Sequence, residues 1–333
     1  MTHVPLYPLR FEPIYQYRVW GGRRLENILD MPLPEGPIGE AWILSDRNDH
    51  PSVVANGELK GLSLSQLMLM WPAALLGDAA GLYTRFPLLL KFLDARERLS
   101  VQVHPSDAQT RYIPRGEHGK TEAWVVLEAD PKSMIRAGLV PGTTPEALKQ
   151  AAEDGTVEHL LSGFVPKIGD GVFIPAGTVH TLGEGVVVFE VQENSDVTFR
   201  LFDWDQVDPK TGKRRALQVE QAIACVDYSK GPVTPVLPVV ETETPCLRER
   251  LFDCEHFGLW RLSGSSPFMV GAMNKARVLV CVAGGGQIKH EIADYPVRKG
   301  DVTLLPAAVG SCFIEPTESV TVLEISLPEG AFR

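Results

Sequence analysis

Three side chains that can bind a transition metal stand at separate points of the chain, each beside a strand-like run. His180 follows Pro175–Gly177, and a Pro-x-Gly sequence forces a tight turn after the apolar run before it. His104 follows another strand-like segment, and Glu122 lies between the two histidines. Two imidazoles and one carboxylate suit Zn²⁺ or another divalent first-row ion. The sequence therefore predicts one metal ion held by side chains from separate strands.

Neighbouring polar side chains extend this predicted site. Residues two apart in a strand point to the same face, so Ser100, Gln102 and His104 are expected to project together. Lys120 and Glu122 share a face by the same rule. The amide oxygen of Gln102 then adds a fourth ligand and leaves coordination positions open for water or substrate. Taken singly, each residue is better explained as a strand end, a surface charge or a polar core residue; their combination favours the metal site.

A second polar segment runs from Phe189 to Arg200. Glu190, Gln192 and Asn194 alternate along it, and Arg200 comes from the next predicted strand. Polar and charged side chains on one wall of an apolar barrel are unusual unless the interior is a polar site. The alternative is the solvated face of an edge strand. We expect this segment to line the same site as the metal ligands.

The elements that must position these residues are mainly strands. Proline and glycine recur at short intervals, with valine-rich runs between them, which is typical of many short strands. Helical patterns are fewer: they cover Leu62–Leu76, the stretch after Thr144 as far as about Leu161, and Gln218–Val226. Thr144 is a good N-cap residue, and a proline follows it at the first helical position. The predicted class is mainly β with a few helical insertions.

An internal repeat divides the chain. Lys167–Ala176 and Arg298–Ala307 both place Gly-Asp before an apolar strand that ends in Pro-Ala, and both are followed by another apolar strand. The repeat predicts two copies of one β-barrel unit. His180 lies five residues after the proline of the first copy, whereas Ser311 occupies that place in the second. Only the first copy is therefore expected to bind metal.

The predicted boundary between the copies falls in the proline- and threonine-rich stretch 231–245. We expect a catalytic domain with helical segments over residues 1–235 and a degenerate domain without a metal site over residues 236–333. A chain of 333 residues is long enough for two domains of this size.

Composition narrows the possible partners. Apolar residues make up 44% of the chain and charged residues 22%, as in ordinary globular proteins. The formal charge of −10 argues against nucleic acid, which needs a basic surface. No N-terminal signal pattern or transmembrane-length apolar run is visible, so we expect a cytoplasmic protein without a membrane partner. An odd number of cysteines without C-x-x-C indicates reduced thiols, at Cys225, Cys246, Cys254, Cys281 and Cys312.

Taken together, these motifs resemble those of the type I mannose-6-phosphate isomerases, in the short bacterial form of the cupin superfamily. The resemblance runs from about Pro8 to Tyr228, and the second barrel, from Glu241 onward, resembles a degenerate C-terminal cupin. It implies two cupin-type, jelly-roll β-barrels. The matching segments, in family order, are Trp20–Gly22, Gly39–Trp42, Phe86–Lys91, Ser100–Pro105, Gly119–Glu122, Pro175–His180 and Gln192–Arg200.

The resemblance implies an enzyme with one Zn²⁺ per chain that interconverts mannose 6-phosphate and fructose 6-phosphate through an enediol. Its small-molecule partner is a sugar phosphate, and both a monomer and a homodimer remain open. The base is either Glu190 or a metal-bound water. The family pattern places the metal ligands on Gln102, His104, Glu122 and His180, the active-site arginine on Arg200, the phosphate contacts on Ser100 and Lys120, and a proton-transfer carboxylate on Glu190.

Three alternatives share this scaffold. Two histidines and a carboxylate also suit an Fe(II) oxygenase, although such a site has no need of Ser100, Lys120 and Arg200 for a phosphate. Another cupin sugar isomerase and a non-catalytic sugar-phosphate-binding cupin are the others. The metal content of the protein and a coupled assay on mannose 6-phosphate separate these possibilities.

Overall fold

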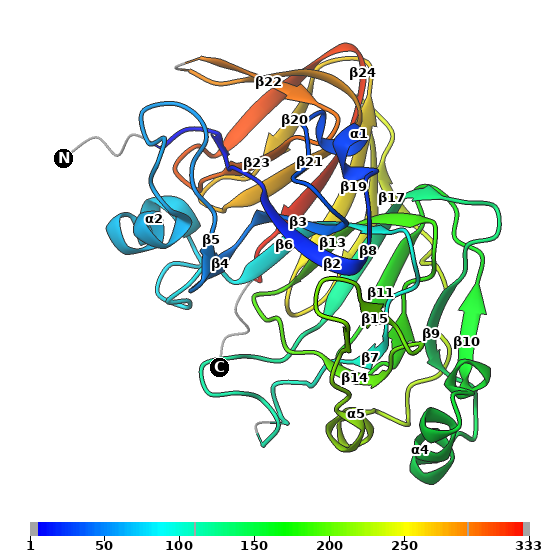
Figure 1. Ribbon diagram of the computed structural model, residues 1–333. Coiled ribbons are helices and arrows are strands. Elements are labelled where there is room, and N and C mark those ends of the chain that lie inside the picture. Colours follow the sequence, from blue (N-terminus) through cyan, green and yellow to red (C-terminus); the bar gives the residue numbers. More distant parts are fainter. Residues whose placement is uncertain (1–5, 110, 292, 329–333) are drawn as a thin grey trace.

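The computed structural model describes residues 6–109, 111–291 and 293–328, which form three main antiparallel sheets and a few short helices (Figure 1). The predicted class, mainly β with helical insertions, is confirmed. Within the described residues, no helix is both long and apolar enough to cross a membrane.

Two of the sheets enclose the predicted site. The six-stranded sheet has the order β11-β8-β13-β6-β2-β3, and the five-stranded sheet has the order β10-β9-β12-β7-β14. The strands of the first are β2 (Ile14–Gly22), β3 (Ile38–Leu44), β6 (Leu88–Ala95), β8 (Glu122–Ala129), β11 (Gly171–Ile174) and β13 (Val186–Glu193). Those of the second are β7 (Val101–Val103), β9 (Ile135–Leu139), β10 (Leu161–Phe164), β12 (His180–Thr181) and β14 (Phe199–Phe202). Two short pairings stand apart, β4 (Asp46–Arg47) with β5 (His50–Pro51) and β15 (Val207–Asp208) with β16 (Lys213–Arg214).

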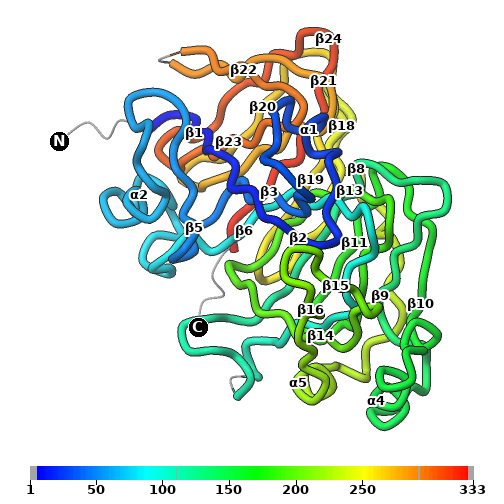
Figure 2. Tube along the Cα trace, in the orientation of Figure 1, coloured from blue at the N-terminus to red at the C-terminus, as the bar shows by residue number. Residues whose placement is uncertain are grey.

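The third sheet holds the C-terminal strands and one strand from the beginning of the chain. Its path is β1-β23-β21-β24-β19-β18-β17, with β20 beside β24 and β22 beside β21. Figure 2 shows β1 lying beside β23. The predicted domain boundary at residue 235 remains a prediction. β1 precedes this boundary, but it pairs with β23 and so belongs to the C-terminal sheet. The strands are β1 (Leu9–Arg10), β17 (Val239–Thr242), β18 (Leu247–Asp253), β19 (Gly258–Gly264), β20 (Phe268–Gly271), β21 (Arg277–Lys289), β22 (Asp294–Arg298), β23 (Val302–Leu305) and β24 (Ser311–Ser326).

The helices are short: α1 (Leu25–Leu29), α2 (Leu64–Met70), α3 (Pro72–Leu76), α4 (Pro145–Glu153), α5 (Val219–Cys225) and the 3₁₀ turn η1 (Val157–Leu160). The prediction of α5 is confirmed, and α4 begins as predicted, because the Thr144 hydroxyl accepts a hydrogen bond from the Ala147 N–H at 3.2 Å. The prediction of one helix through Leu161 is wrong, because Gly155, at φ 70°, ends the run. The single helix predicted over Leu62–Leu76 is divided at Trp71, since a residue that precedes proline disfavours helical geometry.

The two repeat copies fold alike. Gly169 and Gly300 both have positive φ, 89° and 87°, and each precedes an aspartate that closes a turn. The Asp170 carboxylate accepts a hydrogen bond from the Lys167 N–H at 2.8 Å, and Asp301 accepts one from the Arg298 N–H at 2.7 Å. β11 follows the first turn and β23 the second. The sequence repeat therefore corresponds to a structural one.

The five-stranded sheet has an apolar and a polar face. Val101 and Val103 are fully buried in a cluster with side chains of α4 and α5. Burying each such side chain stabilises the fold by about 1.5–3 kcal/mol. Because strand residues alternate, Gln102 between them projects to the opposite face, toward the six-stranded sheet. The helices thus fix the orientation of the strand that carries the predicted ligands.

Candidate active site

The three predicted metal-binding side chains meet in the structure. The ligand atoms of His104, Glu122 and His180 lie within 4.8 Å of one another, and all three residues are buried. His180 Nε2 lies 3.2 Å from Glu122 Oε1, and His104 Nε2 lies 3.5 Å from Glu122 Oε2. They come from β12, from β8 and from the residue after β7, so the cluster joins the two facing sheets.

Both imidazoles are oriented by backbone carbonyls. His104 Nδ1 lies 2.9 Å from the Val197 oxygen, and His180 Nδ1 lies 2.9 Å from the Thr178 oxygen. A carbonyl oxygen can only accept, so each Nδ1 carries the proton and each Nε2 keeps its lone pair. His104 Nε2 is a buried atom for which the described residues supply no hydrogen bond. Such an atom costs free energy unless a partner satisfies it, and a divalent cation is a fitting partner for two imidazoles and a carboxylate.

Gln102 lies next to this cluster. It is the cross-strand partner of His180, and its Nε2 lies 3.2 Å from His180 Nε2. Its Oε1 accepts a hydrogen bond from the Ser100 hydroxyl at 3.3 Å. Rotating the side-chain amide of Gln102 by half a turn exchanges the positions of its oxygen and its nitrogen. The predicted role of Gln102 as a fourth ligand therefore stays a prediction that requires this turn.

The Pro-x-Gly turn connects two of the predicted ligands. The Gly177 N–H donates to the His104 carbonyl at 2.8 Å, and Gly177 has φ 84°, in the left-handed region that favours glycine. The turn that leads to His180 thus also holds the backbone of His104.

We expect Gly177→Ala to lower the free energy of unfolding by about 1–2 kcal/mol and to weaken metal binding. A Cβ at this position would strain φ and lie 3.0 Å from Asp227 Cβ. Gly142→Ala is the matched control, because Gly142 has φ 86° with open space around it and lies away from the cluster. Chelator competition measures metal affinity; an equal effect of both substitutions on that affinity would contradict the proposed connection.

A cavity of about 410 Å³ opens beside the cluster. Five of the predicted site residues line it: Ser100, Gln102, Lys120, Glu190 and Arg200. His104, Glu122 and His180 do not line it themselves, but Glu122 lies 2.7 Å from Lys120 Nζ and His180 lies 3.2 Å from Gln102 Nε2, so the cluster adjoins the cavity. The structure thus brings all eight predicted site residues into one region. Of the other polar residues predicted there, Gln192 and Asn194 instead bond backbone carbonyls, those of Glu193 and Phe86, at 3.0 Å each.

Glu190 is a buried carboxylate with an unusual environment. Its Oε2 accepts a hydrogen bond from Trp124 Nε1 at 2.8 Å, whereas Oε1 has no hydrogen bond with the described residues. Burial raises its pKa, and the charge of Glu122 raises it further, although Lys120 and Lys91 act in the opposite direction. A carboxyl group with a raised pKa in a cavity is suited to general acid-base catalysis.

Lys120 is strongly engaged with carboxylates. Its Nζ lies 2.7 Å from Glu122 Oε2 and 3.7 Å from Glu190 Oε1. Burial lowers the pKa of Lys120, but the charges of Glu122 and Glu190 outweigh burial, so the net pKa is raised. The pKa of Glu122 is likewise held well below its usual range, because Lys120 and His104 outweigh the effect of burial. Lys120 therefore carries its charge among anions.

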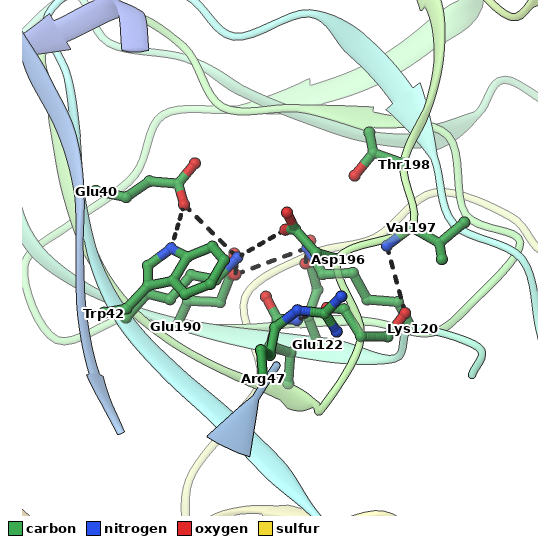
Figure 3. A network of polar contacts seen from close by, with 12 residues as sticks. Glu40, Trp42, Arg47, Lys120, Glu122, Glu190, Asp196, Val197 and Thr198 are labelled. Carbon is green, nitrogen blue, oxygen red and sulfur yellow. Dashed lines mark hydrogen bonds and ion pairs between the residues drawn. The ribbon is translucent and has the colours of Figure 1, made fainter. Parts of the chain in front are cut away.

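Lys91 is a site residue that received no role from the sequence. Its side chain is 3% exposed, and Nζ lies 3.7, 3.6 and 3.4 Å from carboxylate oxygens of Glu40, Glu190 and Asp196. Figure 3 shows this network, which also contains Lys120 and Glu122. A lysine within the otherwise apolar run Leu88–Leu93 was the available signal, since a lysine is almost never buried without partners.

Arg200 lies on β14, two strands from His180 on β12, and no described carboxylate forms an ion pair with its guanidinium. Its backbone pairs with Gln102 in the β7–β14 ladder. Its guanidinium forms no hydrogen bond or ion pair with the described residues, and its Nε is buried. Burial lowers its pKa, and the charges of Arg215 and Arg18 lower it further. A guanidinium stays ionised despite such shifts, so Arg200 offers a free positive charge to a ligand in the cavity.

Without metal, the protein should lose stability as the pH falls. Burial, and next the charge of Lys120, lower the pKa of His104 to about 4, whereas an unfolded histidine titrates near 6.5. Between these values the unfolded chain binds a proton that the folded chain does not, so the free energy of unfolding decreases by at most about 3 kcal/mol as pH falls through this window. Urea unfolding of chelator-treated protein at pH 7 and pH 4.5 measures this loss, and His104→Gln should reduce it. If the free energy of unfolding depends on pH identically in the wild type and in His104→Gln, the loss does not come from His104.

The fold and this site define a class, a cupin-type β protein with a buried His-Glu-His cluster beside a polar cavity. Comparison with known proteins narrows the class. The family model "Phosphomannose isomerase type I, catalytic domain" matches residues 9–132. Mannose-6-phosphate isomerase ManA of Bacillus subtilis is 36% identical over 313 residues, which cover 92% of this chain and 96% of that protein. The corresponding enzyme of Streptococcus mutans is 36% identical over 307 residues, 91% of this chain and 94% of that protein.

Solved structures agree with this comparison. The mannose 6-phosphate isomerase structure from Bacillus subtilis matches with a TM-score of 0.88 and 28% identity, over 96% of this chain and 99% of that one. Variants of phosphomannose isomerase from Salmonella typhimurium share the fold, for example at a TM-score of 0.78 and 15% identity over 96% of this chain and 99% of that one. The chain belongs to the type I phosphomannose isomerase family, and the resemblance found in its motifs is confirmed.

Proposed function

We propose that the protein interconverts mannose 6-phosphate and fructose 6-phosphate with one Zn²⁺ per chain. The observation that carries the proposal is the buried cluster of His104, Glu122 and His180, in which a backbone carbonyl at each Nδ1 leaves the lone pair on Nε2, next to a cavity lined by the carboxylate of Glu190. The names of the related enzymes support the same substrate. Gln102 is proposed as the fourth ligand. When bound, the ion would act as a Lewis acid or hold the sugar hydroxyls in place.

Glu190 is the proposed proton-transfer group. The reaction moves a proton between C2 of the aldose and C1 of the ketose through an enediol, and a base must remove it in either direction. Oε1 of Glu190 accepts no hydrogen bond from the described residues, and a raised pKa suits a carboxyl group that gives and takes a proton. Trp124 holds the other oxygen and fixes the orientation of the carboxyl group.

Arg200 is proposed to stabilise the negative charge that develops on the sugar oxygens. It lines the cavity, and its guanidinium donates to no described residue, so this group needs no rearrangement to meet that charge. The predicted contacts of Ser100 and Lys120 with the phosphate remain proposals. Both line the cavity, although Lys120 already faces two carboxylates.

The cysteines bear on the proposed cellular compartment of the enzyme. All five cysteines are free thiols, four of them buried, which supports the proposed reducing, cytoplasmic environment. A monomer and a homodimer remain equally compatible with the proposal.

A coupled assay on mannose 6-phosphate, together with metal analysis, tests the proposed function. Protein loaded with Zn²⁺ should isomerise the sugar phosphate, and a chelator should remove metal and activity together. Tight sugar-phosphate binding without turnover would instead identify a non-catalytic binding protein. Turnover of another aldose phosphate alone would identify a different sugar isomerase.

A further inference from the structure

Arginines gather at the part of the cavity beyond the metal ligands. Arg200 on β14, Arg18 on β2 and Arg215 just after β16 all line it. After burial, the charges of Arg215 and Arg18 lower the pKa of Arg200, whereas those of Asp203 and Asp196 raise it, so the positive groups repel one another beside two carboxylates. An anion among them would relieve this repulsion.

The sheet fixes the order of groups along the cavity. His180, Gln102 and Arg200 are cross-strand partners on β12, β7 and β14, so they lie side by side on one face. With neighbouring strands about 4.8 Å apart, the backbone of Arg200 lies about 10 Å from that of His180. Gln218 then joins the next segment to Arg200, because its N–H donates to the Arg200 carbonyl at 2.8 Å and its Oε1 accepts from the Arg200 N–H at 3.1 Å. Arg215, three residues before Gln218, is thereby held at the far side of Arg200.

Arg215 is oriented by a two-pronged ion pair with Asp203, which also offsets part of its charge. Its Nε donates to Asp203 Oδ2 at 2.9 Å, and its Nη2 donates to Asp203 Oδ1 and to Gln206 Oε1 at 3.2 Å. Within the described residues, Nη1 of Arg215 has no hydrogen-bond partner. The side chain is 22% exposed, in keeping with a place at the cavity. Arg18 is also held by a two-pronged ion pair, with Glu40, but its Nη1 donates to the Tyr17 carbonyl at 3.2 Å as well, so all three of its nitrogens are engaged.

At the metal end of the cavity, the proposed phosphate contacts of Ser100 and Lys120 need a further cation to offset the charge of the phosphate. Lys120 lies there between Glu122 and Glu190, and Lys91 lies among three carboxylates. A phosphate dianion at either lysine would meet these carboxylates as well. In an aldose 6-phosphate the reacting carbons C1 and C2 lie at the opposite end of the sugar from the phosphate, which fits one end of the substrate at the metal ligands and the other beyond Arg200.

We propose that Arg215 binds the phosphate group of the substrate and sets the preference of the enzyme for a phosphorylated sugar. This inference rests on the proposed function and assigns a residue to it that neither the sequence motifs nor the metal site contains. Arg200 then lies between the phosphate and the reacting carbons.

Steady-state kinetics of Arg215→Ala test the inference. The loss of a charge-assisted hydrogen bond should raise KM for mannose 6-phosphate about 10- to 100-fold and change kcat by less than about threefold. The ratio of kcat/KM for mannose 6-phosphate to that for unphosphorylated mannose should fall by a similar factor. Arg215→Lys keeps the charge but loses the planar fork, so its KM should lie between those of the wild type and Arg215→Ala. Arg214→Ala is the matched control, because Arg214 is exposed and pairs with exposed Asp205.

The effect of inorganic phosphate on Tm tests anion binding without depending on turnover. Phosphate should raise the Tm of the wild type and of Arg214→Ala, and raise that of Arg215→Ala clearly less. If the wild type isomerises mannose 6-phosphate but Arg215→Ala keeps KM and the phosphate response, the inference is wrong and the proposed function stands. If the wild type is inactive, the proposed function fails, and the phosphate response alone decides on the anion site. A fall in kcat without a change in KM would assign Arg215 a structural role and overturn the inference.

Discussion

His180→Ala should remove bound metal and isomerase activity together from a protein that still folds. His180 is fully buried, and its Nε2 lies 3.2 Å from Glu122 Oε1 and beside Gln102. Without this imidazole the cluster keeps one strong nitrogen ligand, so we expect metal affinity to fall by more than about 100-fold and activity by about 1,000-fold or more. Elemental analysis of the purified variant and the coupled assay measure the two losses.

An exposed histidine provides the comparison for this substitution. His159→Ala changes a residue of η1 on the surface and should keep both metal and activity. Circular dichroism shows whether the His180 variant retains its strands. A folded His180→Ala protein with a full complement of metal would overturn the assignment of the ligands.

Arg200→Ala should separate catalysis from metal binding. The guanidinium has no described hydrogen bond or ion pair to lose, so the fold and the metal content should remain unchanged. The developing charge on the sugar oxygens would lose a preorganised cation, and kcat should fall by about 100-fold or more. Kinetics at saturating mannose 6-phosphate measure this loss.

Arg200→Lys is a second, more conservative test of the catalytic role of Arg200. A lysine keeps the charge without the planar fork, so partial activity is expected. If Arg200→Ala alters only thermal stability and leaves kcat unchanged, Arg200 is not a catalytic residue. The contrast with Arg215, for which KM rather than kcat should change, distinguishes the two arginines.

Local patterns in the sequence were sufficient to predict that His104, Glu122 and His180 meet. Alternation along Ser100–His104 placed Gln102 and His104 on one face, and the Pro-x-Gly turn placed His180 opposite them. Both rules describe backbone geometry over a few residues, and the sheet preserves that geometry. The same kind of rule predicted the start of α4 at its cap, but a glycine with positive φ ended the helical run earlier than predicted.

The rest of the site depends on tertiary contacts that spacing does not reveal. Lys91 belongs to a strand whose other residues are almost all apolar, and only the fold shows that Glu190 and Asp196 surround it. Arg215 reaches the cavity from a loop because two hydrogen bonds between Gln218 and Arg200 draw that loop to β14. No short pattern marks such a residue.

The pairing of β1 with β23 has a consequence for how the chain is made. Leu9 and Arg10 lie opposite Leu304 and Thr303, so these strand partners are almost the whole chain apart. At a synthesis rate of roughly 5–20 residues per second, the first strand waits about 15–60 s for its partner to leave the ribosome. Until then Leu9 and Arg10 have no strand to pair with, and the C-terminal sheet lacks its outer strand. The last sheet to be synthesised is therefore completed by the first strand, and the two halves cannot be separated cleanly by cutting the chain at one point.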